Sequence, residues 1–465
     1  MKILLVNPPN ESQAFSMPMG LASIAAYLKN KDKDIDISVI DDWAEKLESA
    51  ELARRVSLSR ADIVGIYMVS PRYDQAKSTI EVCRNALPNS IIIAGGPHPS
   101  ALPVETLREI PQLDICAIGE GELTMQELAE GKPLKTINGI AFRDGKEIKL
   151  TPPRDFIKNL DDLPFPNRDL FPLQKYKPSA PHGRKMPFFI MNTSRGCPFN
   201  CTYCSKDVFR NIYRTVSPKR VADEIEELIS KYHAKEIFFS DDDFSMNIAR
   251  AEGICDEILK RGVKIRWSTS TRVDQVTEQL LNKMHKAGCR FICYGVESGN
   301  QKVLDAIGKG YNTEKAVSAF KMTRRAKIAT VCNFIIGLPG ETKESIRDTL
   351  NLMKRIKPNF ISGSILSIFP GSRLFKLIQA GEYPGKLRNL ESSGRIFLGK
   401  GNYTVLEDNL TYEELKDELQ MVKRKFLLRP QYFWQTLTDI RSLDDLKYYL
   451  QAGMEVIQSL LDKKL

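Results

Sequence analysis

The chain has 465 residues, of which 42% are hydrophobic and 27% are charged, and its formal net charge is +10. This composition suits a globular protein of two or three domains, and nine unevenly spaced cysteines exclude a secreted disulfide framework and favour a reducing cytosol. No run of about 18 apolar residues occurs, which excludes a membrane-spanning helix, and lysines spread along the chain favour a solvated surface over an anionic partner such as nucleic acid.

Residues 1–135 alternate short β-rich runs with amphipathic helical patterns. The first run is too short for a signal peptide or a membrane span, so we expect a strand and a cytoplasmic protein. The alternation predicts parallel strands joined by crossover helices in an open, doubly wound Rossmann-like sheet, which binds ligands at the carboxyl ends of its strands. The five predicted strands are KILLVN, DISVI, DIVGIYMVS, SIIIAGG and LDICAIG.

Small and turn-forming residues follow these strands. They are Asn7-Pro8-Pro9, Ser70-Pro71, Gly95-Gly96-Pro97-His98-Pro99 and Gly119-Glu120-Gly121-Glu122. Glycines at such places let a large ligand approach the backbone, although tight turns alone would also select them. The dinucleotide fingerprint G-x-G-x-x-G is absent, so we do not expect NAD to bind.

Residues 136–187 have the pattern of a hairpin and a linker. Asp144 and Gly145, within GIAFRDGKEIKL, predict a tight turn between two short strands. The following run, NLDDLPFPNRDLFPLQKYKPSAPHG, is rich in proline and predicts an extended linker.

The alternation of strands and helices resumes over residues 188–370. Six strands in this order predict a partial TIM-type barrel, in which functional residues gather at the carboxyl ends of the strands. The predicted strands are FFIMNTS, EIFFS, IRWSTST, RFICYG, IATVCNFIIG and FISGSIL.

Cys197, Cys201 and Cys204 follow the first of these strands in a C-x3-C-x2-C spacing, within NTSRGCPFNCTYCSK. Three thiolates on one short loop, bent by Gly196 and Pro198, can bind one iron–sulfur cluster and leave one iron without a protein ligand. A structural zinc site would need a fourth ligand nearby, and none follows. The loop is also too polar for three core cysteines. We therefore expect an open iron, which is a reaction site.

Polar side chains follow the later barrel strands. The run Asp241 to Asp243 could bind a metal or cap the next helix. Arg272 could bind a carboxylate bidentately or pair with Asp274. Glu297 could accept both hydrogen bonds of a ribose diol, while capping of a helix by Ser298 is the competing explanation for that turn.

Three further cysteines alternate with apolar residues on predicted barrel strands. Cys289, Cys293 and Cys332 could bind a second cluster, but free cysteine is commonly buried, so we interpret them as core residues.

Residues 371–465 are predicted to be helical. The run GRIFLGKG imitates a phosphate loop, but Gly401 stands where Ser or Thr should bind magnesium, so we reject that motif. The basic and aromatic segment KRKFLLRPQYFWQTL predicts an amphipathic helix over the barrel mouth. Contact with a membrane surface or a greasy substrate is the alternative for this segment.

The cysteine loop resembles that of radical S-adenosylmethionine (SAM) enzymes, including Tyr203 just before the last cysteine. The resemblance implies that a 4Fe-4S cluster on Cys197, Cys201 and Cys204 chelates SAM through its open iron, and that one-electron reduction yields a 5'-deoxyadenosyl radical. It places Tyr203 against the adenine. It implies that Asp241 and Asp242 bind the amino group of SAM and that Arg272 binds its carboxylate. It further implies that Ser268 or Ser270 faces the ribose, that Glu297 also contacts SAM, and that Gly337 lies in the turn that contacts the adenine.

Residues 1–135 resemble the cobalamin-binding domain that precedes the radical SAM core in one large subgroup. The resemblance lies in the Asn-Pro-Pro strand end, Pro18-Met19-Gly20-Leu21, the Gly-Gly-Pro-His-Pro-Ser run and the Gly-Glu-Gly-Glu turn. The D-x-H-x-x-G signature is absent, so the lower face of cobalamin would meet the loop from Ser70 to Tyr73 without a histidine ligand. The implied cobalamin residues are Ser70, Arg72, Tyr73, Gly95, Gly96, Gly119 and Glu120. A degenerate domain without cofactor is the alternative.

These resemblances predict a cobalamin-dependent radical SAM enzyme that methylates an unactivated carbon. One SAM would methylate Co(I) cobalamin, a second would give the radical, and the substrate radical would take the methyl group from methylcobalamin. Cyclisation, oxidation or carbon–carbon coupling of a lipid or tetrapyrrole is the first alternative. A tRNA-modifying enzyme is the second, although no second three-cysteine motif or RNA module is evident. A non-enzymatic iron–sulfur protein is the third.

The expected partners are a small-molecule, lipid or peptide substrate and an electron donor such as flavodoxin or ferredoxin. Nucleic acid is not expected among them.

Overall fold

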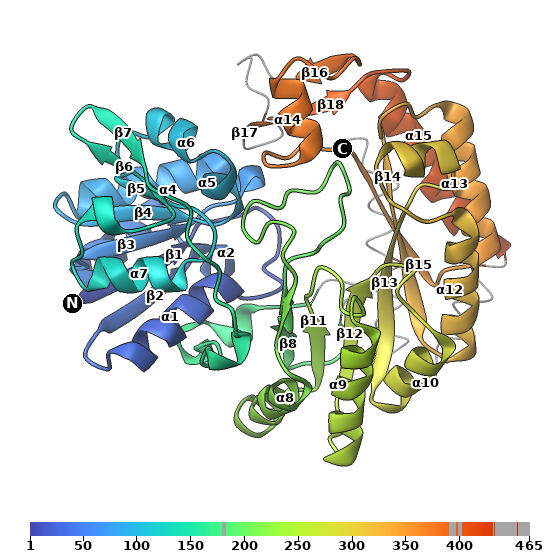
Figure 1. The fold of residues 1–465 in the computed structure, drawn as a ribbon, viewed down its shortest axis with the longest axis horizontal. Helices are drawn as coiled ribbons and strands as arrows, with labels where there is room; N and C mark the ends of the chain where they lie inside the picture. The colour runs from blue at the N-terminus through green and yellow to red at the C-terminus, as the bar shows by residue number, and fades with distance from the viewer. Residues whose placement is uncertain (179–182, 390–396, 399–401, 431, 433–452, 454–465) are drawn as a thin grey trace.

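The computed structural model describes residues 1–178, 183–389, 397–398, 402–430, 432 and 453. Two α/β units lie side by side, the N-terminal one in blue and the second in green to yellow, and a smaller C-terminal part extends from the second unit toward the first at the top of the view (Figure 1).

A seven-stranded sheet forms the N-terminal unit, with strand order β2-β1-β3-β4-β5-β6-β7. The first five strands in this order are parallel, as predicted for a doubly wound sheet. The strands are β1 (Lys2–Asn7), β2 (Asp36–Asp41), β3 (Ile63–Tyr67), β4 (Ile91–Gly95), β5 (Ile115–Ala117), β6 (Ile140–Asp144) and β7 (Glu147–Leu150).

Helices cover both faces of this sheet because its central strands are apolar on both sides. Successive side chains of β1 point to opposite faces: Ile3 and Leu5 pack with α1 and α7, whereas Leu4 and Val6 pack with α3, α4 and α6. The helices are α1 (Met19–Lys31), α2 (Asp42–Glu45), α3 (Ser49–Ser59), α4 (Tyr73–Ala86), α5 (Pro97–Ala101), α6 (Pro103–Glu109) and α7 (Glu122–Ala129).

The predicted hairpin forms, but it belongs to the N-terminal sheet and not to the connector. β6 and β7 pair antiparallel, and β6 also pairs antiparallel with β5 through Cys116 and Ala141. The sheet therefore extends to Leu150. Beyond it the connector is extended, as predicted, with single 3-10 turns at Leu160–Asp162, Arg168–Leu170 and Leu173–Lys175.

A six-stranded parallel sheet, in the order β15-β14-β13-β12-β11-β8, forms the second unit. All six predicted strands are present, and β8 and β15 do not pair with each other within the described chain, as expected of a partial barrel. The strands are β8 (Phe188–Met191), β11 (Glu236–Phe239), β12 (Arg266–Thr271), β13 (Cys289–Glu297), β14 (Ala329–Ile336) and β15 (Phe360–Ile365).

The barrel helices start where the sequence provides a capping side chain. Ser217, Asn247, Thr277, Asn312 and Thr342 each accept a hydrogen bond from a backbone N–H in the first turn of the helix they precede. The helices are α8 (Pro218–Tyr232), α9 (Ile248–Lys260), α10 (Glu278–Lys286), α11 (Gln301–Ala306), α12 (Thr313–Arg325) and α13 (Lys343–Ile356).

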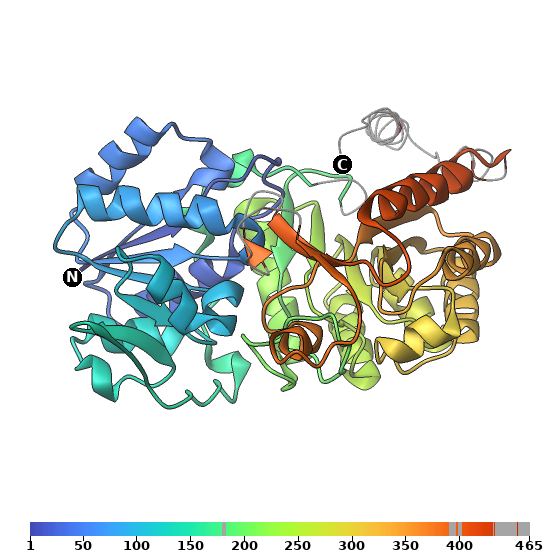
Figure 2. The same ribbon diagram turned by 90° about the horizontal axis from the view of Figure 1, so that it is seen from above.

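The described C-terminal part contains two helices and a small antiparallel sheet that the sequence analysis did not predict. The elements are α14 (Arg373–Gln379), β16 (Leu387–Asn389), β17 (Phe397–Leu398), β18 (Asn402–Leu406) and α15 (Tyr412–Leu427). Figure 2 shows α15 on the barrel side of the molecule, away from the N-terminal unit.

Two predicted C-terminal segments fall partly outside the described residues. Of GRIFLGKG only Phe397–Leu398 is described, and KRKFLLRPQYFWQTL is described only over 423–430 and at 432. No helix among the described residues is long and apolar enough to cross a membrane.

Candidate functional site

The cysteine loop starts directly after β8, at the carboxyl edge of the barrel sheet. Asp241, which follows the neighbouring strand β11, accepts hydrogen bonds from the backbone N–H groups of Thr193 (2.6 Å) and Ser194 (2.9 Å). Gly196 then turns the chain with φ +82°, and a Cβ there would clash with the Ile212 carbonyl oxygen. The sequence thus fixes the approach to the first cysteine.

Backbone hydrogen bonds hold the loop itself. The Thr202 N–H donates to the Ile307 carbonyl (3.0 Å), and the Cys204 N–H donates to the Cys201 carbonyl (3.2 Å). The Leu374 N–H, in the first turn of α14, donates to the Thr202 carbonyl (2.9 Å). The loop is therefore supported by the barrel on one side and by the C-terminal part on the other.

All three cysteines line one cavity of about 460 Å³, here named the cysteine cavity. Five of the residues with a predicted SAM role line the same cavity, although they come from separate segments of the barrel. They are Tyr203, Asp242, Ser270, Arg272 and Glu297.

The three thiols suit a cluster of several metal ions. Cys197 and Cys201 are half-buried and Cys204 is exposed. In the described ranges, no three His, Cys, Asp or Glu side chains come together as ligands of a single ion. An iron–sulfur cluster instead takes one cysteine per iron, which fits three separated thiols on one loop. Burial raises the pKa of the Cys197 thiol, so metal binding must displace its proton.

Arg272 is held rigidly at the cavity wall. Its Nε and Nη2 donate to the two carboxylate oxygens of Asp274 (2.9 and 3.0 Å), and Nη2 also donates to the Lys309 carbonyl (2.6 Å). Its guanidinium lies 3.6 Å from the centre of the Phe199 ring. Nη1 lies 4.0 Å from Cys201 Sγ, so the positive charge faces the thiol. The ion pair considered for Arg272 is present, and Nη1 still points into the cavity.

Glu297 ends β13 with φ +65°, a conformation that few residues other than glycine adopt. Its carboxylate accepts from Lys309 Nζ (2.8 Å), and the same ammonium lies 3.4 Å from the Tyr203 hydroxyl. Burial and the adjacent Glu297 raise the pKa of Tyr203. Lys309 thus orients both a carboxylate and an aromatic hydroxyl at the cavity wall.

Three residues with a predicted SAM role lie outside the cysteine cavity. Asp241 is buried beneath the loop entry, Ser268 is fully buried in β12, and Gly337 donates its N–H to the Glu341 carboxylate (2.6 Å). The capping alternatives considered for these strand ends are wrong, because Asn247 caps α9 and Asn300 caps α11, so neither the aspartates nor Ser298 does.

Lys309 and Asn333 also line the cysteine cavity, and neither was predicted from the sequence as a site residue. Asn333 interrupts the apolar strand β14, and a polar residue inside such a run was a usable signal. Lys309 follows a short helix and has no distinguishing pattern. Cys289, Cys293 and Cys332 are buried, and Cys293 also lines the cavity.

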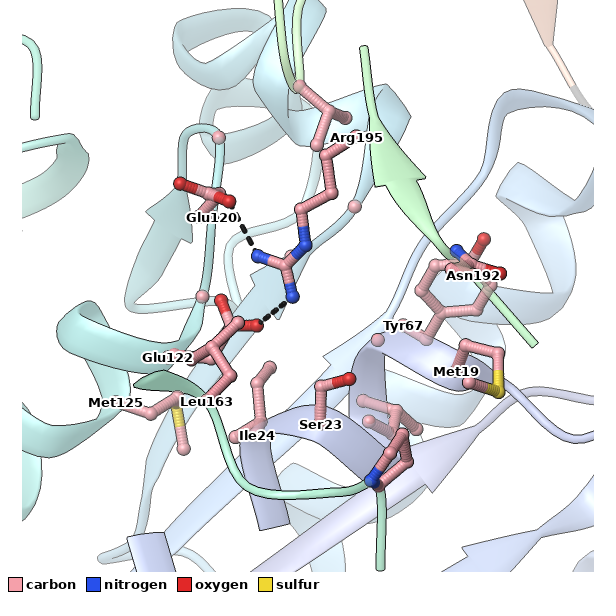
Figure 3. A pocket seen from close by; sticks show the side chains of 18 of the residues that line it. Met19, Ser23, Ile24, Tyr67, Glu120, Glu122, Met125, Leu163, Asn192 and Arg195 are labelled. Atoms are coloured by element: carbon pink, nitrogen blue, oxygen red, sulfur yellow. Dashed lines mark hydrogen bonds and ion pairs between the residues drawn. The ribbon is translucent and has the colours of Figure 1, made fainter. Parts of the chain in front are cut away.

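A second cavity, of about 300 Å³, lies between the N-terminal unit, the connector and the barrel, and is here named the interdomain cavity (Figure 3). Four of the residues with a predicted cobalamin role line it: Gly95, Gly96, Gly119 and Glu120. The connector contributes Leu163 among others.

The walls of this cavity fit a large ligand that approaches the backbone. A Cβ at Gly65 would lie 2.9 Å from Leu5 Cδ2, and one at Gly121 would lie 2.7 Å from Ile24 Cδ1, so the wall has no room for a side chain at these positions and a ligand would meet the backbone there. Ser194 Oγ is buried in the wall and has no hydrogen-bond partner among the described residues. An apolar cradle with an unsatisfied hydroxyl suits a corrinoid, which presents apolar faces and amide side chains.

A buried ion-pair network closes one side of the interdomain cavity, and Figure 3 shows its central arginine between two carboxylates. Arg195 Nη1 donates to Glu120 (2.5 Å) and Nη2 donates to Glu122 (2.6 Å). Arg214 Nη1 also donates to Glu120 (2.9 Å) and to the Ile157 carbonyl (2.7 Å). Glu120 is therefore engaged by two barrel arginines.

Ser70, Arg72 and Tyr73 do not line the cavity but brace the strand ends beside it. Ser70 Oγ and His98 Nδ1 are 2.9 Å apart, and burial lowers the pKa of His98 to about 4, which keeps it neutral. Arg72 donates to the Pro8 carbonyl (2.9 Å), and its guanidinium lies 5.6 Å from the centre of the ring of Tyr67, a cavity residue.

The two cavities share part of their walls. Pro97, Val208 and Phe209 line both of them. Val208 and Phe209 follow the last cysteine by a few residues, and Pro97 follows the Gly95–Gly96 turn. The two cavities are therefore adjacent, and a ligand that contacts these three residues in one cavity contacts side chains that also line the other.

Two family models match the chain. The Radical SAM superfamily matches residues 191–353, and the B12 binding domain matches residues 10–129. An uncharacterized methyltransferase of Pyrococcus horikoshii is 35% identical over 81% of this chain and 83% of its own length. Anaerobic magnesium-protoporphyrin IX monomethyl ester cyclase of Cereibacter sphaeroides is 29% identical over 81% of this chain and 63% of its own length.

The radical SAM methyltransferase TsrM of Kitasatospora setae, solved with tryptophan substrate and a SAM analogue, has a TM-score of 0.76 to this structure. The match covers 92% of this chain and 89% of that one at 19% identity, so it concerns the fold. The same protein has also been solved with cobalamin and a 4Fe-4S cluster bound.

Proposed function

Because the chain belongs to the radical SAM superfamily and carries a B12-binding domain, we propose that it transfers a methyl group from SAM to an unactivated carbon of a small-molecule substrate. When bound, the 4Fe-4S cluster supplies the electron that splits SAM, and cobalamin supplies the methyl group. An external one-electron donor such as flavodoxin or ferredoxin would reduce the protein. The residues of this chain hold, orient and shield these groups.

In this proposal Cys197, Cys201 and Cys204 hold the cluster. Arg272 Nη1 lies beside the Sγ atom of Cys201, so its guanidinium borders the position of the cluster. Because Asp274 already uses Nε and Nη2, only Nη1 of Arg272 remains to bind the carboxylate of SAM.

The other SAM contacts follow from the same cavity wall. Tyr203 offers its ring to the adenine, and Glu297, oriented by Lys309, offers a carboxylate to the ribose hydroxyls. Asp242 is exposed in the cavity, where it can accept hydrogen bonds from the amino group. Interdomain-cavity residues would surround cobalamin, and the shared wall would separate it from the cysteine cavity.

The shared wall is the observation that carries the proposal. Methyl transfer to a carbon radical requires that the radical form next to the methyl donor, and Pro97, Val208 and Phe209 bring the two cavities together.

Product analysis tests the proposal. Anaerobically reconstituted protein, given SAM, hydroxocobalamin and dithionite, is expected to release 5'-deoxyadenosine together with S-adenosylhomocysteine that depends on added cobalamin. Cys201→Ala should reduce 5'-deoxyadenosine to the level without protein. Cys255→Ala is the matched control, because Cys255 is buried in α9 and lines neither cavity.

A second candidate function is cyclisation or oxidation, favoured by the 29% identity to the magnesium-protoporphyrin ester cyclase. That reaction would release 5'-deoxyadenosine with no cobalamin-dependent S-adenosylhomocysteine. This outcome would contradict methyl transfer and support the second candidate. Absence of both 5'-deoxyadenosine and S-adenosylhomocysteine would reject radical SAM chemistry for this chain.

A further inference from the structure

Arg195 lines the interdomain cavity and belongs to the cysteine loop. It stands two residues before Cys197 and reaches across the domain interface, where its two terminal nitrogens bond Glu120 and Glu122 separately. The side chain of Arg195 is 14% exposed, and those of the two glutamates are 3% and 5% exposed. Ion pairs so shielded from water are strong and directional, unlike surface pairs.

The network contains two positive and two negative side chains, so the loss of one of them would leave a buried charge without its partner. Arg195 in β9 (Ser194–Arg195) pairs through the backbone with Arg214 in β10 (Arg214–Thr215), and both arginines bond Glu120. Two cations thus meet two anions in a buried site. Without Arg195, Glu122 would lose the ion pair shown here and Glu120 would keep only Arg214, so the loop that carries them would rearrange.

A rigid path leads from Arg195 to the first cysteine. Only Gly196 lies between them, and its backbone is packed against the Ile212 carbonyl in a conformation with φ +82°. Movement of Arg195 therefore moves Cys197. On the other side, Arg195, Glu120 and Glu122 all line the interdomain cavity, so a ligand there touches the same side chains.

We propose that Arg195 is a positioning residue that couples occupancy of the interdomain cavity to placement of Cys197 in the cysteine loop. This inference rests on the proposed cobalamin site. A ligand in the interdomain cavity contacts Glu120, Glu122 and Arg195, and Arg195 adjoins the loop that holds the cluster. Such coupling is reciprocal, so a formed cluster strengthens cobalamin binding by the same factor.

Titration with hydroxocobalamin, followed by its absorption spectrum, tests the coupling without any substrate. The dissociation constant is measured on iron-free protein and on cluster-loaded protein. For the wild type we expect cluster-loaded protein to bind about 5-fold or more tightly, the lower end of typical coupling between sites. Arg195→Gln should bring the ratio of the two constants close to one. Hydroxocobalamin should also change the electron paramagnetic resonance spectrum of the reduced cluster in the wild type, but not in Arg195→Gln.

Two further variants make the test specific. Arg154→Gln is the control, because Arg154 pairs with Glu127 of α7 but lines neither large cavity, and it should keep the wild-type ratio. Arg195→Lys keeps the charge but can reach only one carboxylate at a time, so an intermediate ratio is expected even if Arg195→Gln folds poorly.

A wild-type ratio in Arg195→Gln, or a ratio of one in the wild type, would overturn the inference and leave the proposed function standing. If the wild type binds no hydroxocobalamin in either form, the cobalamin proposal and this inference fail together.

Discussion

Glu341 is a buried carboxylic acid behind the turn that follows β14. Its carboxylate accepts hydrogen bonds from the N–H groups of Gly337 (2.6 Å) and Leu338 (3.4 Å), which favour ionisation. Burial outweighs them and raises the pKa of Glu341 to about 8. The residue that holds the Gly337 turn is therefore protonated at neutral pH.

This pKa makes stability depend on pH. In the unfolded chain a glutamate titrates at about 4.3, so between that pH and about 8 unfolding releases a proton from Glu341. The free energy of unfolding should fall as pH rises through this window, by roughly 1 kcal/mol per pH unit from this group. Glu341→Gln should remove that part of the slope. Urea denaturation of both proteins at pH 5.5 and 7.5 checks this, and parallel pH profiles would contradict it.

Single residues with a chemical signature were predictable from sequence, whereas residues defined by distant partners were not. The cysteine spacing pointed to one loop, and the structure places all three side chains at one cavity. Lys309 escaped notice because its role comes from Glu297, which β13 brings to it. Asp241 was expected to face SAM, but it turns inward because the loop entry offers two N–H groups.

The cysteine loop depends, as an element, on one glycine. Gly196 has φ +82° and its missing side chain leaves room for the Ile212 carbonyl, so Gly196→Ala should displace the loop and reduce the iron and sulfide bound per chain several-fold. Gly262→Ala is the control, since Gly262 has φ +66° but no atom within 4 Å of the position that an added Cβ would take. Metal analysis after anaerobic reconstitution distinguishes the two. Equal iron content in the two variants would contradict a special role for the Ile212 contact.

Strands with a strong apolar pattern were all predicted correctly, because burial on both faces leaves a continuous hydrophobic run. The hairpin was also predicted from its turn, but its membership in the first sheet was not, since only pairing with β5 decides that. The small C-terminal sheet was missed because its strands have only three, two and five residues, too few to show a clear alternation.

At the scale of the whole molecule, a buried ion pair ties the connector to the barrel. Arg168 of the connector is fully buried and bonds Glu224 of α8, and two of its nitrogens have no partner within the described ranges. Arg168→Met should lower the free energy of unfolding by about 3–5 kcal/mol, because it leaves Glu224 buried and unpaired. The double variant Arg168→Met, Glu224→Met should recover most of this loss. Urea denaturation measures both, and additive losses would contradict the expected coupling.

The arrangement of the two units was beyond the reach of the sequence. Arg195 and Glu120 lie 75 positions apart, and nothing in their local patterns marks them as partners. Arg195 lies in the cysteine loop and Glu120 in the Gly-Glu-Gly-Glu turn, and both motifs were recognised for other reasons. Only the folded chain shows that an ion pair joins the two motifs.

The residues Pro97, Val208 and Phe209 serve both cavities at once. A substitution at any of these three positions therefore changes the lining of both cavities at the same time. A protein of this family that acquired a new substrate would therefore keep the shared wall nearly unchanged, and its substitutions would fall at other residues around the barrel mouth.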